Sequence, residues 1–401
     1  MIQTNGSRVL SLYEGFFSGG ARVLHSTVVT GLHQAGHQKH SVLSLYSEVE
    51  REATLQRMEE DPRYQSLVGV GVRVASLGRS TAGNHDPRDF TEAEMAVATR
   101  EARAAGVILS LKEQPLRLVN HPAFPDRPVV ACLHRSDPEH SGHALDDLLD
   151  SAANGRLAAA VCCAESTRDA YLAAGVPAEL LHVIPNGINL VRFRPVRGAR
   201  RLALRGALGL GADDNAVVYA ARYDAMKNPE LFLRSAREFL AADPQGAVLM
   251  CGAGMSAHNP ALAADIEQIF GDRPDLLGRV HLLGVRLDME RLYAAADVVA
   301  LTSAFGEAAP LCLIEGAMCG AVPVTTPIGD APSIVSRIGF VTSFDPAEIA
   351  ATWIEAAARR EELRRARDSV RPRFSHVRML AGYTRVIERV HRDAGIRLLA
   401  A

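Results

Sequence analysis

The chain has 401 residues, 48% of them hydrophobic and 22% charged, which is ordinary for a globular protein of two or three domains. Lysine plus arginine number 44 and aspartate plus glutamate 46, a formal net charge of −2. This balance excludes disorder driven by charge repulsion and argues against a nucleic-acid partner bound through its phosphates. No apolar run approaches the ~20 residues that span a bilayer, and the polar residues 1–7 do not resemble a signal peptide, so we expect a cytoplasmic protein.

Apolar, strand-like runs alternate with helical patterns through the first half of the chain. The expected strands are 8–13, 38–45, 72–77, 106–111, 128–133, 158–163 and 181–184. A helix is predicted at 21–35, and the charged stretch 47–60 is interpreted as a solvated helical face. The alternation is typical of a doubly wound parallel sheet.

The Arg- and Pro-rich stretch 189–201 lacks apolar periodicity and is predicted to be a linker. The alternation then restarts, with strands expected at 216–221, 247–251, 280–283, 297–301 and 321–325 and helices at 229–241, 288–296 and 311–319. An amphipathic helix pattern covers 374–392. The chain therefore holds two α/β units of similar size. Ligands of open α/β sheets bind at the carboxyl ends of the strands, so two such domains facing across a cleft form a small-molecule site.

The cysteines favour buried thiols over disulfides or a metal site. None of the six, at positions 132, 162, 163, 251, 312 and 319, forms a CxxC pair, and most lie in apolar runs. No His/Cys/Asp cluster has zinc or calcium spacing, so neither a metal nor another cofactor is expected.

The most informative stretch runs from Phe305 to Glu315, after an expected strand and into an expected helix. Pro310 suits a first helical turn, and free amides at a helix start favour a diphosphate. The amides expected there belong to Ala308, Ala309, Leu311 and Cys312. Glu307 and Glu315 are placed to bind sugar hydroxyls, although on their own they could be a capping residue and a surface residue.

Two cations flank the loop after the expected strand 216–221. Arg222 follows the strand and Lys227 precedes a helix, where the pair could clamp a diphosphate leaving group. Ordinary loop cations are the alternative. Lysine occurs only at positions 39, 112 and 227, in a chain whose other basic residues are arginine, which favours a chemical reason for Lys227.

The first half carries weaker signals. Gly19 and Gly20 follow the first strand and allow close approach to a ligand at a helix start. His134 lies at the carboxyl end of an apolar strand, where it can hydrogen-bond a ligand or simply be structural. Lys112 and Glu113 end another strand; they could recognise polar groups of a substrate, with Glu113 meeting an ammonium, or form an ordinary ion pair.

As a set, these residues resemble the family 4 glycosyltransferases, retaining enzymes of the GT-B fold. The resemblance covers nearly the whole chain and includes the Gly-Gly loop, His134, the Arg/Lys pair and the E-x7-E spacing of Glu307 and Glu315. The Gly-x-Gly at Gly252 is intact, whereas Ser333 stands where the family often has Glu. The implied organisation is an acceptor-binding domain at 1–193, a nucleotide-sugar donor domain at 194–371, and a C-terminal helix, 372–401, that packs back on the first domain.

The resemblance also implies roles. Arg222 and Lys227 would neutralise the diphosphate, Glu307 would bind the donor sugar and Glu315 the ribose. The backbone near Val285 and Arg286 would hold the nucleobase, while His134 would contact the reacting sugar or the acceptor. Retention is attributed to front-face attack without a metal.

The substrates are less constrained than the fold. The segment around Lys112 and Glu113 resembles bacterial enzymes of aminoglycoside antibiotic biosynthesis, which glycosylate aminocyclitols from a UDP-N-acetylglucosamine-type donor. The first domain lacks a strongly basic amphipathic helix, so neither a lipid acceptor nor stable membrane association is expected. The alternatives are a nucleotide-sugar 2-epimerase, which needs no acceptor, and a non-catalytic nucleotide-sugar-binding protein.

Overall fold

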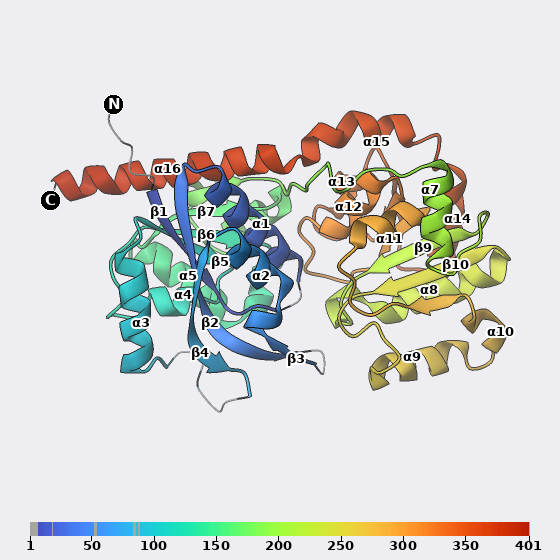
Figure 1. Ribbon diagram of the computed structural model, residues 1–401, viewed down its shortest axis with the longest axis horizontal. Coiled ribbons are helices and arrows are strands. Elements are labelled where there is room, and N and C mark those ends of the chain that lie inside the picture. The colour runs from blue at the N-terminus through green and yellow to red at the C-terminus, as the bar shows by residue number, and fades with distance from the viewer. Residues whose placement is uncertain (1–6, 18, 52–53, 83–85, 87–88, 401) are drawn as a thin grey trace. The chain divides into compact units, whose positions relative to one another are not determined.

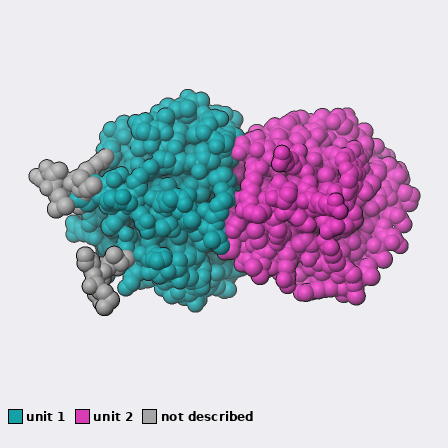
Figure 2. Space-filling model, turned by 90° about the horizontal axis from the view of Figure 1, so that it is seen from above, with its two compact units in different colours: residues 1–186, 377–401 teal, residues 187–376 magenta. Residues whose placement is uncertain are grey.

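The computed structural model describes residues 7–17, 19–51, 54–82, 86 and 89–400 (Figure 1). By internal contacts the chain divides into unit 1, residues 1–186 and 377–401, and unit 2, residues 187–376 (Figure 2). The divisions expected from the sequence were at 193/194 and 371/372. The connecting segments themselves lie in unit 2, where Ile188 pairs with Ser375 in a parallel bridge.

The described residues of unit 1 form an eight-stranded sheet, ordered β3-β2-β1-β5-β6-β7-β8 with β4 paired to β2. The strands are β1 Ser7–Tyr13, β2 Gln38–Arg51, β3 Thr54–Arg57, β4 Arg73–Ser80, β5 Val107–Leu111, β6 Val129–Leu133, β7 Leu157–Cys162 and β8 Leu181–Val183. All pairs are parallel except β2 with β3. The helices of this unit are α1 Gly20–Gln34, α2 Pro62–Gly69, α3 Glu92–Arg103, α4 Leu116–Val119, α5 His143–Ala153, α6 Glu165–Ala173 and the C-terminal α16 His376–Ala400.

The predicted helical face at 47–60 is wrong. β2 extends to Arg51, and β3 pairs with it in the antiparallel sense, with Glu48 opposite Arg57, before a short 3-10 turn. Val49 is 3% exposed between two charged neighbours, which is the period-two pattern of a strand. An ion pair of 3.2 Å between Arg57 and Glu48 joins the two strands. The charged side chains line a hairpin instead of a helix.

Helix α16 packs on unit 1. Leu380 lies so close to Gly31 of α1 that a methyl group at Gly31 would meet it at 2.6 Å. A methyl group at Gly382 would likewise meet the Ile184 side chain at 2.9 Å. Arg378 donates to the carbonyl of Pro185 at 3.1 Å. The last helix thus covers α1 and the end of the first unit.

The described residues of unit 2 form a six-stranded, all-parallel sheet in the order β11-β10-β9-β12-β13-β14. The strands are β9 Asn215–Ala220, β10 Gly246–Cys251, β11 Val280–Leu282, β12 Val298–Leu301, β13 Val322–Thr325 and β14 Phe340–Val341. The helices are α7 Gly198–Gly206, α8 Pro229–Ala242, α9 Pro260–Phe270, α10 Pro274–Leu277, α11 Met289–Ala295, α12 Leu311–Cys319, α13 Ala331–Val335, α14 Pro346–Ala358 and α15 Arg364–Val370.

Alternate residues of the central strand β9 point into two different cores. Ala216 and Val218 belong to one buried cluster, and Val217 and Tyr219 to the other. Such burial on both faces is what a doubly wound parallel sheet requires, and it confirms the predicted α/β class. The predicted linker is shorter than expected, because α7 already begins at Gly198.

Candidate functional site

The carboxyl ends of adjacent strands gather the candidate residues of unit 2. The sheet places β11, β10, β9 and β12 side by side. The segments after these strands carry Val285 and Arg286, Gly252, Arg222 with Lys227, and Glu307 with Glu315. The topology therefore brings residues from four separate segments to one edge of one sheet, where open α/β folds bind ligands.

Lys227 and Glu307 form an ion pair across 80 residues of sequence. The lysine Nζ contacts Glu307 Oε1, which also accepts a 2.6 Å hydrogen bond from the Ser303 hydroxyl. The Glu307 side chain is 6% exposed and that of Lys227 17%. A mostly buried carboxylate that is held by a cation and a hydroxyl has a fixed position.

The backbone of the Lys227 loop is equally constrained. Its carbonyl accepts from the hydroxyls of Tyr219 at 2.6 Å and Thr302 at 3.2 Å. Asn228 adopts a left-handed conformation, φ 52°, and its side chain caps α8 through the amide of Leu231 at 3.2 Å. A non-glycine residue in that conformation is uncommon and often marks a functional loop.

Arg222 lies in the same loop. Its guanidinium contacts Asp224 at 3.0 Å, and the same carboxylate accepts from the amide of Met226 at 2.9 Å, next to Lys227. Asp224 thus ties the Arg222 guanidinium to the backbone of the turn that carries Lys227.

Helix α12 begins beside this cluster. Pro310 occupies the N-cap position instead of the predicted first turn and makes no side-chain capping bond. Ala308 and Ala309 precede the helix, and Leu311 and Cys312 open it. Burial raises the pKa of the Cys312 thiol to about 12, against a smaller opposing effect of Lys227, so the thiol is neutral. The start of α12 is a set of amides next to a lysine, which suits an anion.

Glu315 lies one turn into α12. Burial of its carboxyl raises the pKa to about 8, although Arg192 and a hydrogen bond from Tyr293 act in the opposite direction. The carboxyl is therefore largely protonated at pH 7 in the free protein.

This shift predicts a pH-dependent stability. Between the ordinary pKa of 4.5 and about 8, the unfolded chain loses the Glu315 proton while the folded chain keeps it, so Glu315 lowers stability progressively as pH rises. Glu315→Gln mimics the neutral form. Its melting temperature is expected to match wild type near pH 4.5 and to exceed it by a few degrees at pH 8.5, by scanning calorimetry. A difference that is the same at both pH values would contradict the shift.

Two glycines allow these loops to approach one another. A Cβ at Gly252, where φ is 138°, would lie 1.9 Å from the carbonyl oxygen of Ala221. A Cβ at Gly329, φ 57°, would lie 1.8 Å from the carbonyl oxygen of Glu307. The segment containing Gly329 leads to Ser333, the departure from the family pattern, and packs directly on the Glu307 loop.

Gly252→Ala is therefore expected to destabilise unit 2 by at least about 2 kcal/mol, because backbone must move and the φ is strained. Gly278→Ala is the matched control, since a Cβ there meets nothing within 4 Å and φ is −61°. Thermal unfolding of both variants measures the difference. Equal melting temperatures would show that the two loops are not in this close contact.

Val285 and Arg286, predicted to hold a nucleobase through their backbone, lie after β11. Val285 is 62% exposed. Arg286 makes a two-point ion pair with Asp288 at 2.8 and 2.7 Å, which fixes the Arg286 side chain.

In unit 1, the carboxyl ends of β1, β5 and β6 bring another group together. His134 comes directly after β6, and its Nε2 is buried with no hydrogen-bond partner among the described residues. Burial first, and then the charge of Lys112, lowers the pKa of His134 to about 3, so the ring is neutral. A neutral ring with an unpaired nitrogen at a sheet edge is suited to a polar ligand.

Lys112 adopts a left-handed conformation, φ 67°, at the end of β5. Its amide donates to the carbonyl of Cys132 at 3.0 Å, and its own carbonyl accepts from the Ser110 hydroxyl at 2.8 Å. Burial and the nearby Arg22 lower the pKa of the Lys112 ammonium to about 8. The lysine is thus held, partly desolvated, beside His134.

Glu113 does not lie where an acceptor would reach it. The residue is 0% exposed and accepts a hydrogen bond from the Tyr171 hydroxyl of α6. Burial raises the pKa of its carboxyl, with Lys112 acting in the opposite direction. This corrects the expectation that Glu113 is presented to an ammonium: the strand end turns its side chain inward, toward a buried tyrosine.

Gly19 and Gly20 lie at the start of α1, with Gly19 at the N-cap position; Ser18 of the same loop lies outside the described residues. Arg22, one turn in, is 5% exposed, donates to the Gly15 carbonyl at 2.8 Å and stacks on the Phe17 ring. The sequence reasoning missed Arg22 and also Ser303. The signal for Ser303 was its place directly after an apolar strand.

The described part of the chain contains no group of three or more His, Cys, Asp or Glu residues able to hold a metal ion. Its cysteines are free thiols. No helix in the described ranges is long and apolar enough to cross a membrane.

The fold is that of GT-B glycosyltransferases. A cyanobacterial protein, Anabaena Alr3699/HepE, in complex with UDP-glucose superimposes with a TM-score of 0.73 over 96% of this chain and 99% of its own, at 21% identity. Sucrose-phosphate synthase from Thermosynechococcus elongatus gives 0.72 over 96% and 100%, at 18% identity. At these identities the likeness shows the fold alone.

Sequence comparison finds a glycosyltransferase domain in each half of the chain. Residues 18–192 match the family model described as Glycosyltransferase Family 4, and residues 214–359 match the one described as Glycosyl transferases group 1. Each half of the chain is therefore similar to a glycosyltransferase domain, which supports a glycosyltransferase of the group 1/family 4 type.

Among curated relatives, D-inositol 3-phosphate glycosyltransferase of Mycolicibacterium vanbaalenii is 32% identical over 226 residues, 52% of this chain and 48% of that protein. The Thermobispora bispora protein of the same name is 29% identical over 242 residues, 55% and 54%. The matched part of this chain spans about half the length of these relatives.

Proposed function

We propose that this protein is a retaining glycosyltransferase that moves a sugar from a nucleotide-sugar donor to a hydroxyl of a small polar acceptor. The observation that carries the proposal is the Lys227–Glu307 ion pair, positioned by Ser303 and placed beside the start of α12 and the Arg222 loop. A cation pair next to helix-start amides suits a diphosphate, and an oriented carboxylate suits sugar hydroxyls.

In this reaction the glycosidic carbon–oxygen bond to the diphosphate breaks and negative charge grows on the leaving phosphate. Lys227 and Arg222 offset that charge, and backbone amides at the start of α12 add hydrogen bonds. The acceptor hydroxyl attacks from the same face, and its proton passes to the leaving phosphate. Because two side chains supply the positive charge, the proposal needs no metal ion.

The donor favoured is a UDP-sugar, with UDP-N-acetylglucosamine the first choice. The structural relative Anabaena Alr3699/HepE, seen with UDP and with UDP-glucose, supports a uracil nucleotide. In this proposal the exposed turn at Val285 and Arg286 offers backbone to the base. Glu315 offers the ribose a neutral carboxyl, which both donates and accepts a hydrogen bond.

The acceptor favoured is a cyclitol, including the aminocyclitols of antibiotic biosynthesis. The relatives named for D-inositol 3-phosphate support a ring of hydroxyls as the recognised group. In unit 1 the unpaired Nε2 of His134 and the ammonium of Lys112 are the groups available to it. Glu113 is not included in the proposed acceptor site, because its side chain is buried against Tyr171.

The experiment is a two-stage screen of the purified protein. Thermal stabilisation by UDP-, GDP-, ADP- and dTDP-sugars identifies the donor, since a ligand at about 100 times its Kd adds roughly 2.7 kcal/mol. The stabilising donor is then incubated with myo-inositol, inositol phosphate and aminocyclitols, and products are separated by mass spectrometry and NMR. An α-linked glycoside from an α-linked donor supports the proposal. Stabilisation without any consumption of donor would overturn catalysis in favour of a binding protein.

A further inference from the structure

Unit 2 contains a basic pocket lined by residues other than those of the candidate donor site. It has a volume of about 300 Å³. Its walls come from the start of α7, the end of α12 and the α14–α15 region. Six arginines line it against two carboxylates, Glu361 and Asp368; the arginines are Arg197, Arg201, Arg360, Arg364, Arg367 and Arg371.

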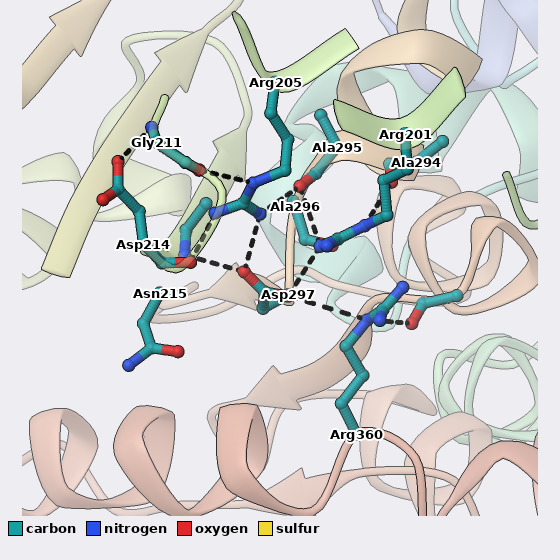
Figure 3. Close-up of polar contacts among 12 residues, drawn as sticks. Arg201, Arg205, Gly211, Asp214, Asn215, Ala294, Ala295, Ala296, Asp297 and Arg360 are labelled. Atoms are coloured by element: carbon teal, nitrogen blue, oxygen red, sulfur yellow. Dashed lines mark hydrogen bonds and ion pairs between the residues drawn. The ribbon is translucent and has the colours of Figure 1, made fainter. Parts of the chain in front are cut away.

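The arginines in and around the pocket outnumber the carboxylates that pair with them. The Asp297 carboxylate forms ion pairs with Arg201 at 2.6 Å, with Arg205 at 3.1 Å and with Arg360 at 3.7 Å (Figure 3). One carboxylate thus faces three guanidinium groups, two of which, Arg201 and Arg360, also line the pocket. Burial and the neighbouring Arg201 lower the pKa of Arg360, as expected for cations crowded together.

Arg367 supplies an unsatisfied donor in this wall. The residue is 5% exposed, and its Nη2 donates to the carbonyl of Arg360 at 2.7 Å. Its Nη1 is buried with no hydrogen-bond partner among the described residues. Buried guanidinium nitrogens are normally paired, so a donor left open in the wall of a basic pocket points to a ligand.

The start of helix α7 also lines the pocket. Gly198, the first residue of α7, lines it, and Arg197 at the N-cap position makes no side-chain capping bond. The first amides of a nine-residue helix add positive potential to that of the arginines.

We propose that this pocket binds the phosphate group of a small molecule, with Arg364, Arg367 and Arg197 as its direct partners. Arginine matches phosphate through paired donors, and a pocket of about 300 Å³ has room for a phosphomonoester as well as for free phosphate. The site goes beyond the proposed sugar transfer and does not depend on it.

The position of the pocket suggests a consequence for the donor site. Ala317, Met318 and Gly320 line it at the end of α12, and Arg371 and Arg360 donate to the carbonyls of Met318 and Gly320 at 2.9 and 3.0 Å. The same helix begins at the predicted diphosphate amides. An anion held by Arg364, Arg367 and Arg197 therefore lies in the same pocket as the arginines that hold the end of the helix that carries Glu315.

Isothermal titration of the full-length protein with inorganic phosphate and with glycerol 3-phosphate, at constant ionic strength, tests the site. Wild type is expected to bind saturably, and Arg364→Ala to bind about tenfold more weakly, the loss of one charge-assisted contact. Tighter binding of glycerol 3-phosphate identifies an ester as the ligand, and equal binding identifies free phosphate.

Two controls separate this site from others. Arg365→Ala removes the same charge from the same helix at an exposed position outside the pocket lining and is expected to bind like wild type. Lys227→Ala removes the candidate donor lysine and should also bind like wild type. Absence of saturable binding to wild type, equal weakening in Arg364→Ala and Arg365→Ala, or loss in Lys227→Ala alone would each overturn the proposal.

Discussion

Alanine in place of Lys227 is expected to lower donor turnover by roughly 10²–10³-fold, because the charge that grows on the leaving phosphate then loses a preorganised cation. The Lys227 side chain is 17% exposed and held beside Glu307. Water in its place would therefore stabilise the negative charge of the phosphate less than the ammonium does. Turnover is measured as release of the nucleoside diphosphate from the donor identified by the thermal screen. The loss should fall mainly on kcat, since the interaction strengthens in the transition state.

The chain offers a matched control for that variant. Lys39→Ala removes one of the other two lysines, an exposed residue on β2. It is expected to keep the wild-type rate. Near-wild-type turnover in Lys227→Ala, with Lys39→Ala behaving identically, would remove Lys227 from the reaction.

Alanine in place of Glu307 is expected to lower turnover by a similar 10²–10³-fold, through lost contacts to the donor sugar and a displaced Lys227. Because the two side chains touch, their effects are not independent. The double variant Lys227→Ala/Glu307→Ala should lose much less than the product of the two single losses. Steady-state rates of the four proteins measure this coupling.

Glu230→Ala is the control for Glu307, since Glu230 is an exposed residue of α8 that pairs only with Arg234 among the described residues. It is expected to leave the rate unchanged. Fully multiplicative losses in the double variant would mean that Lys227 and Glu307 act at separate places, contrary to the ion pair.

Much of the site could be predicted from strand ends that are visible in the sequence. The apolar runs before Arg222 and His134 are strands, and parallel strands place the loops at their carboxyl ends along one edge of the sheet. Helix α12 begins and ends at the predicted residues because Pro310 precedes it and Gly320, φ 104°, comes directly after it. Residues that start or stop a helix act on their immediate neighbours, so they can be recognised from the local sequence.

Contacts that depend on tertiary packing could not be predicted. The Lys227–Glu307 pair joins segments 80 residues apart, and no periodicity links them. Glu113 looked like an accessible strand-end carboxylate, and only the position of Tyr171 shows that it is buried. The hairpin at 47–57 was missed because its charged residues resemble a helix surface until Val49 is seen to be buried among them.

Calorimetric titration with UDP shows whether Lys227 in unit 2 holds the diphosphate of a nucleotide sugar. Wild type and Lys39→Ala are expected to bind UDP with the same Kd, and Lys227→Ala at least about tenfold more weakly, the loss of one charge-assisted contact. Equal affinity in all three proteins, or no binding of UDP or any other nucleoside diphosphate to wild type, would contradict the account.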